Sequence, residues 1–315
     1  MTGHRNTTKV HRSGTAAIIG RSNVGKSTLL NAALEQRLAI VTPTPQTTRD
    51  RILGVVRHGS AQIALLDTPG MHRPKSRLGR RMNAAARTAL EGADVMVFMT
   101  SVPPRVPEEP SAHPGDVSLL QDLGKDLPAV LVINKVDLWK DKAPLLPLIG
   151  ALSQIRPFDA VVPISALKSD GVDLVLDEVA KLLPERGPVY DEDFLTDRPT
   201  RFFASEFIRE QVFLQTEQEV PHSVAVSIDR FEETPEIVHV DATVHCTRAG
   251  QKSILIGHRG EKMKQIGIAA RAQIEAMVER KVNLKLWVKV SEDWLESQQL
   301  MAELGYDPDG GEAQP

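Results

Sequence analysis

The chain contains a single cysteine, Cys246, and lacks any apolar run near the roughly 20 residues that a membrane-spanning helix requires. One cysteine cannot form a disulfide within the chain, which fits a reducing compartment. Residues 1–9 have no apolar core, so we expect no secretory signal there. These absences predict a cytoplasmic protein, while peripheral contact with the inner face of the cell membrane stays open.

Basic residues are concentrated in one part of an otherwise acidic chain. Between Arg248 and Lys289, ten basic residues stand against three acids, a net charge of +7. Since the whole chain carries −3, the remainder carries −10. A local basic surface on an acidic protein is typical of polyanion binding. Ordinary solvated helix and strand faces would give the same count, so charge alone does not decide between the two.

The stretch Gly20-Arg21-Ser22-Asn23-Val24-Gly25-Lys26-Ser27 fits the pattern G-x-x-x-x-G-K-[ST] of phosphate-binding loops. An apolar strand over 15–19 is predicted before it and a helix over 28–34 after it, which is the context such a loop needs. The helix N-terminus adds partial positive charge. Lys26 is expected to reach the terminal phosphates, and the Ser27 hydroxyl is expected to bind Mg²⁺. The alternative is an ordinary glycine turn before a helix.

A second strand end, at 61–67, carries Asp67-Thr68-Pro69-Gly70. Asp67 is expected to hold Mg²⁺ through water, and the Gly70 N–H to sense a γ-phosphate. The loop that follows would then be a switch. This tetrapeptide alone is weak evidence, because many turns have the same composition.

Two further strand ends predict a pocket for guanine. Asp137, in Asn134-Lys135-Val136-Asp137 after a strand over 129–134, would accept hydrogen bonds from two N–H groups of guanine that adenine does not offer together. Asn134 and Lys135 would brace this pocket. After a strand over 160–164, the Ala166 N–H beside Ser165 would face the guanine carbonyl. The Ser165-Ala166 segment is weak evidence on its own and supports a guanine pocket only because of its position at a predicted strand end.

The segment from Thr44 to Asp50 is expected to be a switch loop that Mg²⁺ and the γ-phosphate order. Thr48 is the preferred threonine to complete the Mg²⁺ shell, and Thr47 is the alternative. The other interpretation is a surface loop that has no ordered structure of its own. The two interpretations are compatible, because a switch loop can be ordered only when Mg²⁺ and the γ-phosphate are bound. The switch residues are Gln46, Thr47, Thr48, Arg49 and Asp50.

Regular structure breaks at 184–199, where three prolines, a glycine and an acidic run mark a linker. Beyond it the sequence predicts a helix over 202–214 and another over 261–279. Alternating apolar residues predict strands at 223–229, 237–245 and 282–290. Ser291 is expected to cap a final short helix that ends at Leu304.

This order of elements, with Gly257-His258-Arg259-Gly260 before the long helix, looks like a KH domain of the bacterial type. In that module the Gly-x-x-Gly loop joins two helices and clamps about four single-stranded nucleotides. Trp287 is the only aromatic residue in the last strand, so we expect recognition to use hydrogen bonds and aliphatic packing more than ring stacking. The expected RNA-binding residues are Lys252, Gly257, His258, Arg259, Gly260, Lys262 and Lys264.

The complete motif set resembles the Era family of translation-factor-type GTPases over nearly the whole chain. The resemblance implies an α/β P-loop domain with a mostly parallel six-stranded sheet and helices on both faces, followed by a smaller α+β KH type-2 domain. It implies slow hydrolysis of GTP to GDP and phosphate, cycled with binding of the 3′ end of small-subunit ribosomal RNA during 30S subunit maturation. The strands at 51–58 and 61–67 are too close for a crossover and should be antiparallel. We expect a monomer.

The matching motifs also predict domain boundaries and site residues. The domains are a basic flexible N-terminus (1–13), the GTPase domain (14–184), the linker (185–199), the KH domain (200–305) and a disordered tail (306–315). The expected Mg²⁺ ligands are Ser27, Thr48 and, through water, Asp67. The residues expected around GTP or GDP are Gly20, Arg21, Ser22, Asn23, Val24, Gly25, Lys26, Ser27, Thr28, Asp67, Thr68, Pro69, Gly70, Met71, Asn134, Lys135, Asp137, Ser165 and Ala166.

The position after Gly70 holds Met71, whose thioether cannot orient the attacking water as the glutamine of Ras-like GTPases does. Proteins that resemble this family often carry an apolar residue here and use a monovalent cation beside the phosphates, held partly by a phosphate-loop asparagine. Asn23 stands at the matching position. The hypothesis is that K⁺ binds there and at the switch backbone near Thr42 to Thr47, and the alternative is that Asn23 is only a turn former.

Two other functions are consistent with parts of this sequence. One is a guanine-nucleotide-sensing RNA chaperone in which hydrolysis is incidental, which single-turnover phosphate release would distinguish from an enzyme. The other is a GTPase of the tRNA-modifying or double-GTPase kind. The single copy of the nucleotide motifs and the absence of an extra catalytic cysteine argue against it.

Overall fold

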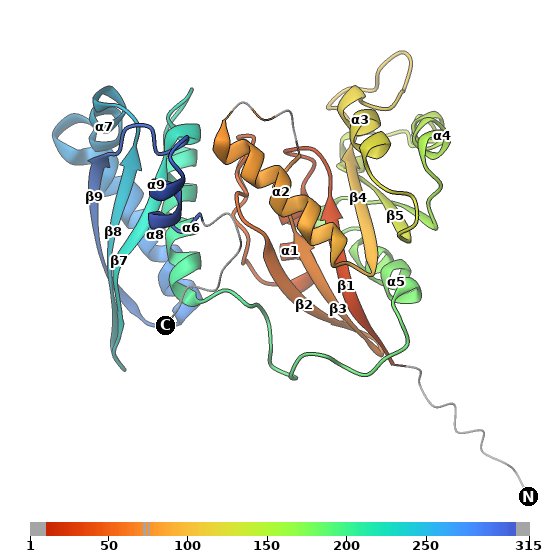
Figure 1. The fold of residues 1–315 in the computed structure, drawn as a ribbon, viewed down its shortest axis with the longest axis horizontal. Coiled ribbons are helices and arrows are strands. Elements are labelled where there is room, and N and C mark those ends of the chain that lie inside the picture. The colour runs from red at the N-terminus through yellow and green to blue at the C-terminus, as the bar shows by residue number, and fades with distance from the viewer. Residues whose placement is uncertain (1–10, 72–73, 75, 307–315) are drawn as a thin grey trace, which may run out of the picture. The chain divides into compact units, whose positions relative to one another are not determined.

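The computed structural model describes residues 11–71, 74 and 76–306 of the chain (Figure 1). Residues 1–10 of the expected flexible N-terminus and the expected tail after Tyr306 lie outside the described residues. The rest forms two compact units. One holds residues 11–37, 51–71 and 85–197, and the other holds 38–50, the described part of 72–84, and 198–306. Two segments from within the expected GTPase domain therefore belong to the C-terminal unit.

The first unit is built on the six-stranded, mostly parallel sheet that the sequence predicts. Its strand order is β2-β3-β1-β4-β5-β6, and β2 pairs antiparallel with β3 as expected. The four remaining pairs are parallel. The strands are β1 (Arg12–Ile19), β2 (Ile52–His58), β3 (Ala61–Asp67), β4 (Val95–Ser101), β5 (Ala129–Asn134) and β6 (Ala160–Pro163). Strand β1 begins at Arg12, inside the stretch expected to be flexible.

Helices cover both faces of this sheet, so its inner strands are nearly continuous apolar runs (Figure 1). Helices α1 and α5 contact each other and lie on one face, while α2, α3 and α4 share the core of the other face. Only the second half of α2 belongs to this unit. The helices are α1 (Lys26–Leu34), α2 (Arg77–Glu91), α3 (Pro114–Asp122), α4 (Leu145–Ile155) and α5 (Val172–Leu182).

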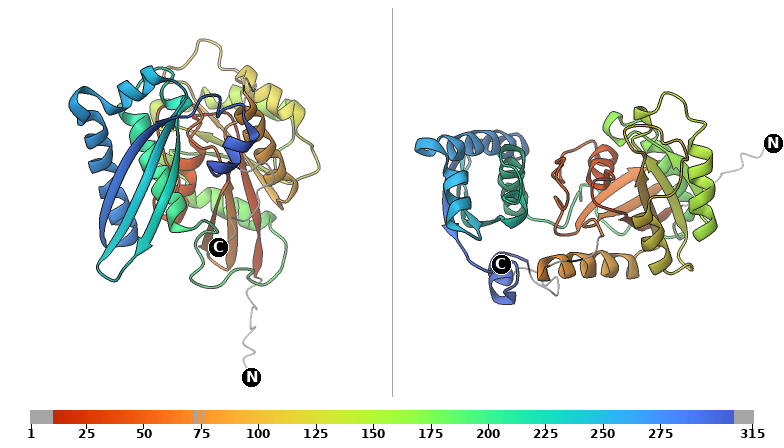
Figure 2. Two further views of the ribbon diagram at one scale, coloured as in Figure 1. Left: turned by 60° about the vertical axis from the view of Figure 1, so that its left-hand side comes forward. Right: turned by 90° about the horizontal axis from the view of Figure 1, so that it is seen from above.

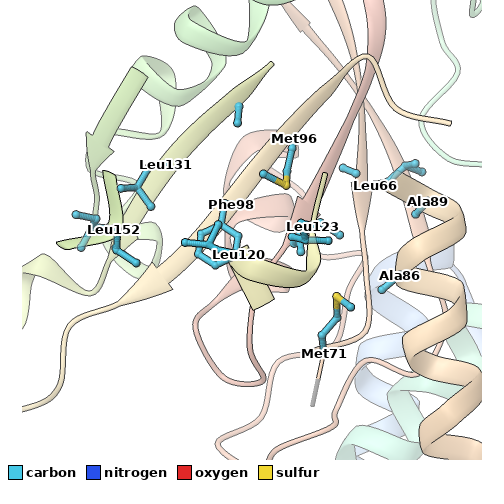
Figure 3. Packing of buried hydrophobic residues seen from close by; sticks show 14 of the residues in the cluster. Leu66, Met71, Ala86, Ala89, Met96, Phe98, Leu120, Leu123, Leu131 and Leu152 are labelled. Carbon is cyan, nitrogen blue, oxygen red and sulfur yellow. The ribbon is translucent and has the colours of Figure 1, made fainter. Parts of the chain in front are cut away.

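The core between the sheet and α2, α3 and α4 is formed by alternate residues of the central strands (Figure 3). Met96 and Phe98 of β4 and Leu131 of β5 are fully buried there. Leu120 of α3 and Leu152 of α4 cover them from the helix side. This packing fixes the carboxyl ends of the strands, where the predicted nucleotide motifs begin.

The second unit contains the smaller α+β domain that the sequence predicts (Figure 2). Its sheet has the order β7-β8-β9, with β7 and β8 antiparallel and β8 and β9 parallel. The strands are β7 (Ala225–Glu233), β8 (Ile237–Cys246) and β9 (Lys281–Val290). The helices are α6 (Thr200–Gln215), α7 (Ala249–Ile256), α8 (Glu261–Val278) and α9 (Gln298–Glu303). Its short 3₁₀ turns are η3 (Pro221–Ser223) and η4 (His258–Gly260), while η1 (Val136–Leu138) and η2 (Ala166–Lys168) belong to the first unit.

One predicted helix cap is wrong. The final helix, α9, begins at Gln298, and its N-cap is Ser297, whose hydroxyl accepts a hydrogen bond from the Leu300 N–H. Ser291 instead follows the end of β9, and its hydroxyl lies 2.9 Å from His245 Nδ1. Trp294, fully buried between these two serines, occupies the intervening segment in the core of the second unit.

None of the helices in the described part of the chain combines the length and the apolar character needed to cross a bilayer.

Replacing Phe98 with alanine tests the core of the first unit. Because the side chain is fully buried, we expect the free energy of unfolding to fall by ~3–5 kcal/mol. Guanidinium unfolding followed by circular dichroism measures the change. The control is Leu146→Ala on α4, where the leucine is 71% exposed and the expected change is under ~0.5 kcal/mol. Equal losses in the two variants would contradict this account of the core.

Candidate functional site

The predicted phosphate loop follows β1 and leads directly into α1, and its glycines have no room for side chains. A Cβ on Gly20 would lie 2.2 Å from the Met99 carbonyl oxygen. Gly25 has φ +103°, and its Cβ would lie 2.2 Å from Nδ2 of Asn134. Only glycine meets both the close approach and the left-handed backbone. The loop therefore passes against neighbouring strand ends with its backbone.

Lys26 is buried within this loop. Its ammonium group donates hydrogen bonds to the carbonyl oxygens of Gly20 at 3.2 Å and Arg21 at 2.9 Å. Burial lowers the pKa of Lys26 to about 8, although Asp67 nearby opposes this change. Neutral carbonyls are its hydrogen-bond partners, so a phosphate anion would be a stronger partner for the same charge.

Ser27 and Asp67 lie together where the sequence predicts a Mg²⁺ site. The Ser27 hydroxyl donates to Oδ2 of Asp67 at 2.6 Å, and the carboxylate is fully buried. Burial raises the pKa of Asp67 to about 6. Oδ1 of Asp67 is buried without a hydrogen-bond partner, which is a costly arrangement for a carboxylate oxygen. A hydroxyl beside a carboxylate with an unused oxygen fits Mg²⁺, a hard cation that prefers oxygen ligands and keeps several waters.

Asn134 connects the predicted guanine pocket to the phosphate loop. Its Nδ2 donates to the Val24 carbonyl at 2.8 Å, and its Oδ1 accepts from the Ala166 N–H at 2.9 Å. Lys135 donates from Nζ to the Asn23 carbonyl at 2.6 Å. Three predicted segments from different strand ends thus meet at one edge of the sheet.

Asp137 lies in η1, directly after this cluster, and is partly exposed. The Ser165 hydroxyl lowers the pKa of its carboxyl group, and Lys168, whose Nζ lies 3.6 Å from Oδ2, acts in the same direction. Asp137 is therefore ionised at neutral pH and able to accept two hydrogen bonds from a guanine edge.

The segment after β3 lies against the phosphate loop. The Met71 N–H donates to the Gly20 carbonyl at 3.2 Å, and Met71 is 4% exposed. A Cβ on Gly70 would lie 2.6 Å from the Cα of Ser22. Thr68 donates to the Ile18 carbonyl at 2.7 Å. The thioether of Met71 is packed into the core, so it does not orient water.

Sequence reasoning missed Asp116, a buried partner of the phosphate loop. Arg21 Nε donates to Asp116 Oδ1 at 2.7 Å, and Arg21 Nη2 donates to Oδ2 at 3.1 Å. Thr100 adds a hydrogen bond to the same carboxylate at 2.7 Å. Asp116 follows Pro114 in the first turn of α3, and only the fold brings it to the loop 95 residues before it.

The predicted switch residues belong to the second unit. The Thr47 hydroxyl donates to the Thr44 carbonyl at 2.7 Å and lies 2.6 Å from the Thr42 hydroxyl. Gln46 adopts φ +65°. Thr48 is buried, at 9% exposure. The hydroxyl of Thr47 is thus engaged within its own loop, and the choice between Thr48 and Thr47 as the Mg²⁺ ligand stays a prediction.

Arg49 is buried in a cage formed by the C-terminal part of the chain. Its guanidinium donates to the carbonyl oxygens of Val224 at 2.5 Å, His222 at 3.2 Å and Pro221 at 3.3 Å. Its Cζ also lies between 5.6 and 6.0 Å from the ring centroids of Trp294, Phe213 and Tyr306. Such cation–π contacts strengthen when the cation is desolvated, and Arg49 is 2% exposed.

The neighbouring Asp50 is held by the first half of α2. Arg81 Nη2 donates to Asp50 Oδ1 at 2.6 Å, and the Arg81 guanidinium lies 5.5 Å from the Tyr306 ring. Leu78 and Met82 of the same helix share a buried cluster with Trp294. The predicted switch segment from Thr44 to Asp50 is therefore packed against other residues of the second unit.

The predicted Gly-x-x-Gly loop joins α7 to α8, as expected. Gly257 has φ +72°, and its Cβ would lie 2.6 Å from the Cβ of Lys262. Gly260 has φ +83°, but no atom lies within 4 Å of its Cβ position. The space above Gly260 is open, so a phosphate backbone can approach closely. Among the described residues, no ion pair involves the exposed Arg259 or the predicted cations Lys252, Lys262 and Lys264.

Comparison with known proteins gives a consistent result over nearly the whole chain. Residues 15–135 match a family described as 50S ribosome-binding GTPase, and residues 219–295 match the KH domain family. GTPase Era of Ruminiclostridium cellulolyticum is 42% identical, with 94% of this chain and 98% of that protein covered. GTPase Era of Xanthomonas campestris is 43% identical, with 95% and 99% covered.

Two solved structures resemble this one. The first is Era in complex with MgGDPNP and nucleotides 1506–1542 of 16S ribosomal RNA, with a TM-score of 0.89 and 38% identity over 94% of this chain and 99% of that chain. The second is a variant of Aquifex aeolicus Era bound to GDP·AlF₄⁻, with a TM-score of 0.87 and 37% identity over 94% and 99%.

Replacing Asn134 with alanine tests the contact between the guanine pocket and the phosphate loop. The change leaves the Val24 carbonyl and the Ala166 N–H without partners, at ~1–3 kcal/mol each. We expect the affinity for GDP, measured by calorimetry, to fall by at least about tenfold. Gln154→Ala on the exposed face of α4 is the control and should bind GDP normally. Normal affinity in Asn134→Ala would refute the bridging role.

Proposed function

The chain belongs to the Era family of GTPases, which hydrolyse GTP to GDP and phosphate, and we propose that its nucleotide state controls binding of ribosomal RNA. The target in this proposal is the 3′ end of small-subunit ribosomal RNA during 30S subunit maturation. The proposal draws on the RNA in the relative's complex and on the exposed Gly-x-x-Gly loop of this chain.

In the nucleotide site, hydrolysis depends on positioning and electrostatics. The loop N–H groups and Lys26 hold the phosphates, and Asp137 selects guanine. Ser27, Thr48 and, through water, Asp67 are the proposed Mg²⁺ ligands, as the Mg²⁺ in the relative's complex and the unused Asp67 oxygen suggest. The metal, when bound, neutralises charge that develops on the phosphates. Because Met71 cannot orient water, fixed charges and the backbone N–H of Gly70 carry the catalysis.

The RNA site lies on the KH domain, for which we propose boundaries of 200–305. The open approach at Gly260 lets the RNA backbone reach the loop, and Arg259, Lys252, Lys262 and Lys264 attract its phosphates. The other proposed parts are the GTPase domain (14–184) and the linker (185–199); the expected flexible N-terminus (1–13) and disordered tail (306–315) are not proposed as such, because β1 begins at Arg12 and Tyr306 is buried. We propose a cytoplasmic monomer, with peripheral membrane contact as a question for lipid-binding assays.

The buried Arg49 is the observation that carries the proposed coupling. Arg49 is held by three carbonyls and three aromatic rings of the C-terminal unit. It directly follows Thr48, the proposed Mg²⁺ ligand. Because the two residues are adjacent in the chain, a nucleotide-dependent change in the backbone at Thr48 would also change the contacts of Arg49. A ligand shifts an equilibrium only through such a difference in contacts between two states.

Binding of labelled 16S nucleotides 1506–1542, measured by anisotropy with GDPNP and with GDP, tests the coupling. We expect affinities that differ by about fivefold or more between the two nucleotides, the usual lower range for allosteric coupling. Equal affinities would refute nucleotide control, because coupling between two ligands is reciprocal.

The substitution Arg49→Lys tests whether the contacts of the Arg49 guanidinium couple nucleotide binding to RNA binding. Lysine keeps the positive charge but lacks the planar guanidinium group that donates to several carbonyls at once. The ratio of the RNA affinity with GDPNP to that with GDP should therefore fall toward one. The affinity for GDP should change by less than about threefold, since Arg49 belongs to the other unit. The matched control is Arg51→Lys, whose side chain is 50% exposed. A wild-type ratio in Arg49→Lys, with an unchanged melting temperature, would refute the role of the cage.

The proposed K⁺ site rests on Asn23, which is exposed in the phosphate loop with φ +63°. K⁺ held there and by the switch backbone near Thr42 to Thr47 would supply the charge that an arginine finger supplies in other GTPases. We expect GTP hydrolysis to be about tenfold or more faster in KCl than in NaCl, and Asn23→Ala to lose the difference. Asn283→Ala, in β9, is the control. Equal wild-type rates in the two salts would rule K⁺ out.

A further inference from the structure

Strand β9 carries a row of basic residues and one tryptophan on its outer face. From Val282 to Val290, alternate apolar side chains turn inward and are buried or half-buried. The residues between them are exposed. Three of these, Lys285, Trp287 and Lys289, together with the exposed Lys281 at the start of the strand, define what we call the β9 stripe.

Trp287 has no structural role that would explain its presence in the stripe. Its side chain is 50% exposed, whereas the other tryptophans, Trp139 and Trp294, are 3% and 0% exposed. Its neighbour across the parallel pair is Thr243, which is too small to cover an indole ring. No ring stacking or cation–π contact of Trp287 occurs within the described part of the chain. Tryptophan is usually well covered, so an uncovered ring in mid-strand indicates a binding surface.

The charges of the stripe are not neutralised by the protein. Within residues 11–71, 74 and 76–306, no ion pair involves Lys281, Lys285 or Lys289. Lys285 lies opposite Asp241 in the strand register, but the two form no ion pair. On β7, Glu232 pairs with Arg230, and Asp229 accepts a hydrogen bond from Thr243, the cross-strand neighbour of Trp287. Strand β9 is also an edge strand, so no other strand of the described residues pairs with its outer edge.

We propose that the β9 stripe binds single-stranded RNA, with a base stacked on Trp287 and the lysines beside the RNA backbone. This inference rests on the RNA-binding function proposed above and extends it to nucleotides flanking those at the Gly-x-x-Gly loop. The loop holds about four nucleotides, so a longer strand must lie on neighbouring surface. Helices α7 and α8, which the loop joins, pack on the inner face of β9, so an RNA strand that leaves the loop must pass around the edge of β9 to reach the stripe on the outer face.

The composition of the stripe favours RNA over a protein partner. A cationic surface interleaved with an aromatic ring is the usual platform for single strands, since every base has a face that can stack. The cores of protein interfaces are depleted in lysine. The sequence alone predicted little ring stacking in this domain, because Trp287 is the only aromatic residue in the last strand. The exposed indole revises that expectation.

Tryptophan fluorescence gives a direct test on the wild-type protein. Because Trp139 and Trp294 are buried, acrylamide quenching reports mainly on Trp287. With 16S nucleotides 1506–1542 bound, we expect the quenching constant to fall to the value of the Trp287→Phe protein, which keeps only the two buried tryptophans. Unchanged quenching at saturating RNA would overturn the proposal and leave a protein partner as the better occupant.

Variants at exposed positions give a second readout. Trp287→Leu should raise the Kd for the RNA at least about fivefold, which corresponds to ~1 kcal/mol of lost stacking, while Trp287→Phe should stay within about twofold. Lys289→Ala should weaken binding modestly. Arg259→Glu at the Gly-x-x-Gly loop tests the proposed function separately. If Arg259→Glu weakens binding but Trp287→Leu does not, the stripe is refuted and RNA binding stands. If the wild-type protein does not bind the RNA, both proposals fail.

Discussion

The close approach of the phosphate loop to the strand ends beside it is the constraint on which the nucleotide site depends. At Gly20, Gly25 and Gly70, any side chain would collide with backbone or with the Asn134 amide. The absence of side chains lets Asn134 hold the loop and Ala166 at hydrogen-bond distance. The buried core beneath the sheet keeps these strand ends fixed, so the backbone donors for phosphate are in place before nucleotide binds.

A second constraint is the burial of a permanently charged group. Arg49 cannot lose its proton, and it has no carboxylate partner in its hydrogen bonds; carbonyl dipoles and aromatic faces compensate its charge instead. Carbonyls and rings stabilise the guanidinium only in a specific geometry, so the cage tolerates little displacement. A nucleotide-dependent loop tied to such a cage has few intermediate positions, which suits a two-state switch.

The sequence predicted the features that are encoded locally. Strand and helix periodicity, the glycine spacing of the phosphate loop and the Gly-x-x-Gly loop between two helices are all confirmed in the structure. Features that depend on distant residues were missed, because nothing near Asp116 or Trp294 indicates its partner. The wrong N-cap prediction has a local cause, because Ser291 and Ser297 are both followed by residues that a helix accepts. In the structure the segment between them is taken up by the buried Trp294, and the helix begins after Ser297. The exposure of Trp287 was a further feature of this kind, because it depends on which face of β9 the helices cover.

The Arg21–Asp116 pair and the exposed cations of the KH unit differ in how ionic strength acts on them. Counter-ions screen exposed charges beyond about 8 Å at physiological salt, but they do not enter a buried contact. The Asp116 side chain is 1% exposed and its pair keeps the phosphate loop in shape at any salt concentration, whereas the cations of the KH unit face the solvent. Rising ionic strength therefore weakens the attraction between these exposed cations and a polyanion, while the Arg21–Asp116 contact is much less affected.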